Sequence, residues 1–76
     1  MGINNIKFSY KPLWKLMIDR EITNSELIKI SGISKSTFYK MKNGENITTD
    51  VLLKICGSLN VDISEIMECE NKKVDR

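Results

Sequence analysis

The feature that most constrains the fold is a Gly-Ile-Ser turn at residues 32–34, because a complete set of helix signals stands on each side of it. Thr23 and Glu26 are spaced as a capping box, in which each side chain pairs with the backbone N–H of the other. The glycine of the turn supplies the left-handed conformation that ends a helix, and the serine is a favoured N-cap. We therefore predict helices over residues 24–31 and 35–43, joined as a helix-turn-helix.

Three further helices are expected outside this motif. Pro12 predicts a helix over residues 12–20, because proline lacks the N–H that the first helical turn leaves unpaired. Thr48 caps a fourth helix. Apolar residues recur at helical spacing along it: Leu52, Ile55, Cys56 and Leu59. Asp62 and Glu65 form a second capping box, which predicts a short fifth helix.

The two ends of the chain carry weaker signals. Residues 6–10, IKFSY, alternate apolar and polar side chains, which favours a short strand. The polar residues 68–76 are expected to fray, although Val74 is compatible with a weak strand. The expected fold is all-α: a compact five-helix domain over residues 12–67, after an arm or short strand at 1–11 and before a polar tail.

Length and composition exclude several classes of function. A chain of 76 residues forms one small domain without room for a large enclosed substrate cavity. It has no histidine, and Cys56 and Cys69 lack the further ligands that a zinc site requires. We interpret Cys56 as a small core residue and Cys69 as a free thiol. We expect no metal, no cofactor, no small-molecule effector and no enzymatic activity.

The apolar residues never run long enough to span a membrane, and the first ten residues do not resemble a signal peptide. We therefore expect a cytoplasmic protein.

Positive charge is concentrated in the first part of the chain. Residues 1–44 carry eight basic and three acidic side chains, a formal charge of +5, whereas residues 45–76 carry four and seven, a charge of −3. Within residues 31–44, SGISKSTFYKMKNG, three lysines and no acid surround the pair Phe38–Tyr39. Such a segment can face a polyanion. The alternative interpretation of the same lysines is a solvated helix face.

The expected helix over residues 35–43 has two distinct sides. Phe38 and Met41 are three residues apart and can fix one side to the core. The other side then presents polar and basic groups: Lys35, Ser36, Tyr39, Lys40 and Asn43. Because the second helix of a helix-turn-helix enters the DNA major groove, these groups are placed to meet phosphates and base edges.

The run EITNSELIKISGISKSTFYKMKNGENIT, followed by LLKICGSLNVDISEIM, resembles the lambda-repressor/Cro-like (XRE-type) helix-turn-helix family. The resemblance covers about residues 12–67. It includes the capped helix, the Gly-Ile-Ser turn, the Ser-Thr-aromatic opening of the next helix and the Asn-Gly stop. Within the family the chain is most similar to minimal members that have only the DNA-binding domain. The resemblance implies a five-helix bundle that binds double-stranded DNA.

The resemblance also implies which positions contact DNA. Asn24 stands where the family contacts the DNA backbone and braces the recognition helix. Lys35 and Ser36 occupy the first two positions of that helix, which commonly read bases, and Lys40 occupies a later base-facing position.

The remaining implied contacts lie around these positions. Lys42 and Asn43 form the phosphate-binding end of the recognition helix, and Ser34 precedes it as the cap. Tyr39 is either a surface residue or a DNA contact that stacks on a sugar or touches a thymine methyl group.

Two functions stay open at this point. The first is a sequence-specific transcriptional regulator, a repressor acting on a palindromic operator. The second is a protein-interaction module on the same fold, such as an antitoxin or assembly partner. We expect a homodimer through Ile63, Ile66 and Met67 with a contribution from residues 6–10, which can pair with a second copy or with residues 68–74. The alternative is a monomer that dimerises only on DNA.

Overall fold

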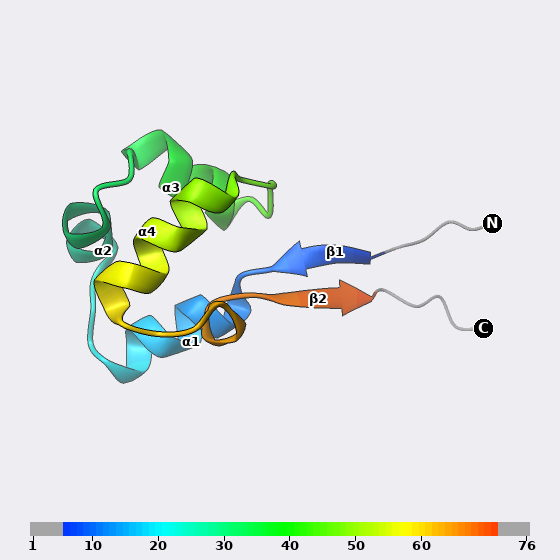
Figure 1. The fold of residues 1–76 in the computed structure, drawn as a ribbon, viewed down its shortest axis with the longest axis horizontal. Coiled ribbons are helices and arrows are strands. Elements are labelled where there is room, and N and C mark those ends of the chain that lie inside the picture. Colours follow the sequence, from blue (N-terminus) through cyan, green and yellow to red (C-terminus); the bar gives the residue numbers. More distant parts are fainter. Residues whose placement is uncertain (1–5, 72–76) are drawn as a thin grey trace.

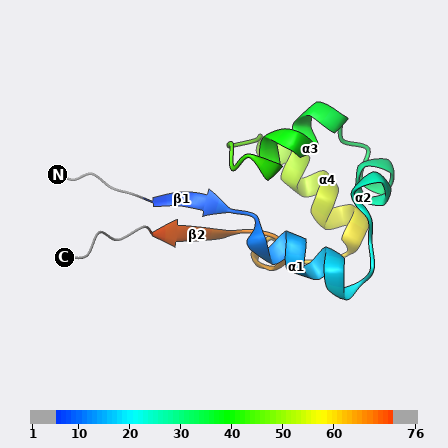
Figure 2. The same ribbon diagram turned by 180° about the vertical axis from the view of Figure 1, so that it is seen from behind.

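The computed structural model describes residues 6–71, which form four α-helices, one 3-10 turn and a two-stranded sheet. In chain order these are β1 (Ile6–Ser9), α1 (Lys11–Asp19), α2 (Asn24–Ser31), α3 (Lys35–Lys42), α4 (Thr49–Leu59), the 3-10 turn η1 (Ile63–Glu65) and β2 (Glu68–Asn71). The helices gather at one end of the molecule, and the paired strands extend away from them (Figures 1 and 2). This arrangement gives the molecule a long axis of 42 Å against 23 and 19 Å.

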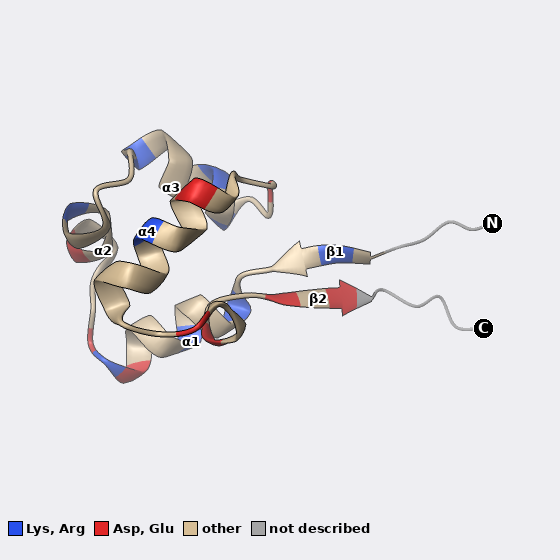
Figure 3. Ribbon diagram, in the orientation of Figure 1, with Lys and Arg blue, Asp and Glu red and all other residues tan. Residues whose placement is uncertain are grey.

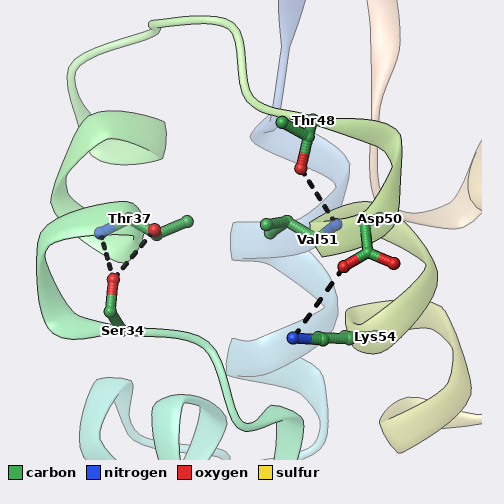
Figure 4. A network of polar contacts seen from close by, with 6 residues as sticks. All are labelled: Ser34, Thr37, Thr48, Asp50, Val51 and Lys54. Carbon is green, nitrogen blue, oxygen red and sulfur yellow. Dashed lines mark hydrogen bonds and ion pairs between the residues drawn. The ribbon is translucent and has the colours of Figure 1, made fainter.

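The helix-turn-helix predicted from the caps is confirmed. The Thr23 hydroxyl accepts a hydrogen bond from the Glu26 N–H at 3.1 Å, and the Glu26 carboxylate accepts one from the Thr23 N–H at 2.8 Å. Gly32 ends α2 with a φ of 76°, a left-handed conformation that glycine adopts without steric cost. The Ser34 hydroxyl then accepts from the Thr37 N–H at 3.1 Å and starts α3 (Figure 4).

The core lies between the helices and receives fully buried side chains from each of them and from the segment after η1. These are Leu13, Leu27, Phe38, Met41, Ile55 and Ile66. Both residues predicted to fix the recognition helix, Phe38 and Met41, are among them, so the predicted orientation of α3 is confirmed. The far ends of α1 and α4 are also joined, because the Arg20 guanidinium donates to the Leu59 carbonyl at 2.7 Å.

The prediction of a fifth α-helix is wrong, although its capping box is present. The Asp62 carboxylate accepts from the Ser64 N–H at 3.2 Å, which lowers the pKa of Asp62, and the Glu65 carboxylate accepts from the Asp62 N–H at 3.2 Å. Only one 3-10 turn follows, because Glu68 already pairs with Ser9 in the sheet. The short segment left between the cap and the strand cannot hold an α-helix.

The strand predicted over residues 6–10 is present as β1, and its partner is β2 of the same chain. The two strands run antiparallel, with Phe8 opposite Cys69 and Lys7 opposite Glu70. The expected helical domain with short terminal strands is therefore present, but with four α-helices instead of five. The expected fraying of residues 68–76 is wrong for residues 68–71, which form β2. The rest of that tail, including Val74, and the part of the N-terminal arm before residue 6 lie outside the described residues.

The two cysteines are free and differ in exposure. Cys69 is exposed on β2, in line with its interpretation as a free thiol, whereas Cys56 is only half-buried on α4 rather than a full core residue. Burial and the nearby Asp62 and Glu65 carboxylates raise the pKa of the Cys56 thiol. Within residues 6–71 no cluster of three potential metal ligands is found, and no helix has the length and apolar character to cross a membrane.

Candidate nucleic-acid interface

The outward face of α3 is built by the residues opposite its buried pair. Successive helical residues are rotated by about 100°, so burial of Phe38 and Met41 places the side chains opposite this pair on the solvent side. Five sequence-predicted residues are exposed there: Lys35, Ser36, Tyr39, Lys40 and Asn43. Tyr39 retains 52% of its accessible surface even though it directly follows the fully buried Phe38.

Charge on this face has a single sign. The segment from Ser34 to Asn43 contains lysines but no acidic residue. Acidic ribbon segments lie on other elements, including α1, α2, α4 and β2, and basic segments mark both ends of α3 (Figure 3). A basic helix without acids offers the electrostatic attraction on which nucleic-acid binding depends.

The first turn of α3 is held by hydroxyl groups. The Ser34 hydroxyl, besides its bond from the Thr37 N–H, donates to the Thr37 hydroxyl at 2.9 Å and lies 3.1 Å from the Ser36 hydroxyl. Ser34 therefore acts first as a structural cap, and its side chain is engaged within the protein. Lys35 and Ser36 follow it at the exposed start of the helix.

Lys42 lies on a different side of α3 from Lys40. Its ammonium lies 4.5 Å from the centroid of the Trp14 ring and 5.8 Å from that of Phe38. A cation over an aromatic face is attracted to it by about 0.5–1 kcal/mol at exposed sites. Lys42 is thus held on the side of α3 that faces α1. Lys40 lies on the other side, where it borders a shallow hollow with Thr48.

Trp14 contributes to this region through its contacts with Phe38 and Lys42, which the sequence did not predict. It is half-buried on α1, and its ring packs edge-on against Phe38, with centroids 5.7 Å apart. Only the tertiary structure brings this ring to Lys42. The Tyr10 ring continues the aromatic row at 6.5 Å from Trp14, and its hydroxyl donates to the Glu45 carbonyl at 3.2 Å.

Asn24 begins α2 and is exposed. It borders the same shallow hollow as Trp14 and Lys42, so the start of α2 and the end of α3 meet around the tryptophan. Among residues 6–71 its side chain makes no hydrogen bond to α3. The resemblance implied that the residue at this position braces α3. The short asparagine side chain makes no such hydrogen bond within the described residues.

The structure combines a capped helix-turn-helix with a second helix that is anchored in the core and carries an acid-free basic face. The profile of the Cro/C1-type HTH DNA-binding domain matches residues 12–72. The chain belongs to this family. The resemblance drawn from the sequence is thereby confirmed, and the protein contains a Cro/C1-type DNA-binding domain, for which DNA is the partner.

A solved structure supports the same assignment. The crystal structure of the transcriptional regulator VanUg, Form II, matches this Cro/C1-type chain with a TM-score of 0.85 and 42% sequence identity. The match covers 95% of this chain and 96% of the VanUg chain. The comparison with curated proteins gave no significant match.

Proposed function

We propose that this Cro/C1-type protein is a sequence-specific transcriptional repressor that reads double-stranded DNA with α3. The observation that carries the proposal is the exposed, acid-free face of α3, which is backed by the fully buried Phe38 and Met41. Burial of these two side chains fixes the orientation of the helix, so that the same groups always face outward. A rigid reading element of this kind is what major-groove recognition requires.

The exposed residues divide into base-reading and backbone-binding groups in this proposal. Lys35 and Lys40 donate to guanine O6 and N7, the acceptors that lysine commonly meets in the major groove, and Ser36 contacts an adjacent base edge. Tyr39 touches a thymine methyl group or a sugar. Phosphates are bound by residues at the ends of the motif: Asn24, Lys42 and Asn43.

Selection of bound duplexes from a random DNA pool, at near-physiological salt, tests the proposal. We expect one enriched motif that contains two inverted half-sites about 10 base pairs apart, the spacing of one helical turn. Recovery of no motif would contradict sequence-specific reading. If the protein instead forms a stable complex with a co-purifying protein and does not retard DNA, the interaction-module function replaces the proposed one.

The inverted repeat requires a two-fold dimer, and the structure changes which residues are available for it. Ile66 is fully buried and is therefore removed from the expected dimer surface. Ile6 and Phe8 alternate along β1 and share one face of the sheet, where they stay 57% and 44% exposed, and Ile63 is 42% exposed. We propose that this face of the sheet, with Ile63, forms the dimer interface.

Replacing both Ile6 and Phe8 with serine is expected to convert a dimer into a monomer, because the substitution removes the exposed apolar groups of the sheet. Sedimentation at micromolar concentration measures the change. Ile18→Ser is the matched control, since Ile18 is 75% exposed but lies on α1. A wild-type protein that stays monomeric both free and on a palindromic duplex would exclude the two-fold arrangement.

A further inference from the structure

A hollow of about 230 Å³ opens between β1, the start of α1 and the end of α3. Three lysines from these three separate elements border it: Lys7, Lys11 and Lys42. Asn43 and Trp14 also line it. The hollow therefore adjoins the end of α3 but extends onto β1 and α1, which lie outside the helix-turn-helix.

The charges around this hollow favour an anion. Lys7 and Lys42 form no ion pair with any residue of the described range 6–71, and both are exposed. The one acidic residue in the lining is Glu70, whose carboxylate lies 3.9 Å from the Lys11 ammonium. Three positive groups thus surround one negative group, so a net positive charge is left for a ligand.

Trp14 determines where one of these charges sits. Its ring holds the Lys42 ammonium at 4.5 Å, on the α1 side of α3 and away from the side that carries Lys40. Lysine binds phosphate as a point charge, so a fixed position next to two further lysines favours a single phosphate group. The lining of the hollow is mostly polar, which also suits an oxyanion better than an apolar ligand.

We propose that this hollow binds a phosphate of the DNA backbone, as a second contact beside the groove that α3 enters. The inference rests on the proposed function, because the position of the DNA follows from α3 lying in the major groove. A helix in that groove has a sugar-phosphate wall on each side, and the hollow lies on the α1 side of α3. The contact anchors the domain without reading sequence, since phosphates carry no base information.

Removing the charge of Lys7 or Lys11 tests the proposal. Lys7→Gln and Lys11→Gln should weaken binding to the selected operator and to a duplex of mixed sequence by the same factor. The slope of log affinity against log salt concentration should fall in magnitude by about 0.9 for each phosphate that the variant no longer neutralises. Lys29→Gln is the matched control, because Lys29 is exposed on α2 and does not border the hollow; it should leave the slope unchanged.

Substitution of Glu70 should change DNA affinity in the opposite direction. Glu70→Gln removes the acid from the hollow and frees Lys11, so it should strengthen binding to both duplexes. Glu68→Gln changes the net charge equally on the same strand, but Glu68 does not border the hollow. A larger gain for Glu70→Gln than for Glu68→Gln supports the phosphate site.

The proposal is overturned if the variants at Lys7, Lys11 and Glu70 behave like their controls while the wild type binds its operator. Wild-type protein that binds no duplex would overturn both this proposal and the proposed function. Lys7→Arg and Lys11→Arg should restore the salt slope. A drop in affinity that these arginine variants do not restore, accompanied by a lower melting temperature, would show that the two lysines are structural and would also overturn the site.

Discussion

Replacing Phe38 with alanine is expected to destabilise the domain by about 3–5 kcal/mol, the usual cost of truncating a fully buried phenylalanine. The side chain is 0% exposed, and its ring packs edge-on against Trp14 and Tyr39 at 5.7 and 5.6 Å. Small domains have a total stability of about 5–15 kcal/mol. The substitution therefore removes much of the available stability, and urea unfolding followed by circular dichroism measures the loss.

Tyr39→Ala is the control for Phe38→Ala, because the two residues are adjacent on α3 but face opposite environments. Tyr39 is 52% exposed, and its truncation removes mainly the edge-on packing against Phe38, which is worth about 0.5–1.5 kcal/mol. We expect a folded protein with altered DNA affinity. Equal losses of stability in the two variants would show that the assigned orientation of α3 is wrong.

The helix boundaries around the turn could be predicted because the interactions that set them are local. Thr23, Ser34 and Thr48 each cap a helix by accepting from a backbone N–H three residues later. Serine and threonine are favoured N-caps because their side chains make this bond within the first helical turn. The buried side of α3 was also predictable, since it depends only on the helical spacing of Phe38 and Met41.

The end of the chain was not predictable from such signals. Asp62 and Glu65 form their capping box as expected, but the helix after it is only one 3-10 turn. Its length is determined by the pairing of Glu68 with Ser9, residues far apart in the sequence. Local sequence signals predict where a helix begins. The end of this one is set by pairing with a strand that is distant in the sequence.

Some features of the candidate site could likewise be predicted from local sequence, whereas others depend on tertiary packing. The exposed residues of α3 follow from its own spacing, and so does the interpretation of Lys35 and Lys40 as outward groups. The position of Lys42 depends on Trp14, which another helix brings to it. The hollow bordered by Lys7 and Lys11 forms because β1 and α1 fold against α3. No local sequence motif predicts this packing.

Lys40→Ala is expected to change which base is preferred within each half-site, at a cost of about 1–3 kcal/mol on the selected operator. Lys40 is exposed on α3, and its ammonium is not held by an ion pair with any residue of the described range 6–71. Its loss removes a donor to a base edge, so the selected operator should be weakened more than duplexes that differ at the contacted base. Repeating the selection with the variant measures this relaxation directly.

Asn43→Ala provides the contrast that separates reading from anchoring. Asn43 is exposed at the C-cap of α3, where its amide can meet a phosphate, so its loss should weaken binding to all sequences by a similar factor and leave the motif intact. Both variants remove an exposed side chain from the same helix, and neither should lower the melting temperature appreciably. A Lys40→Ala protein that keeps both the selected motif and the operator affinity would mean that this part of α3 does not read the DNA.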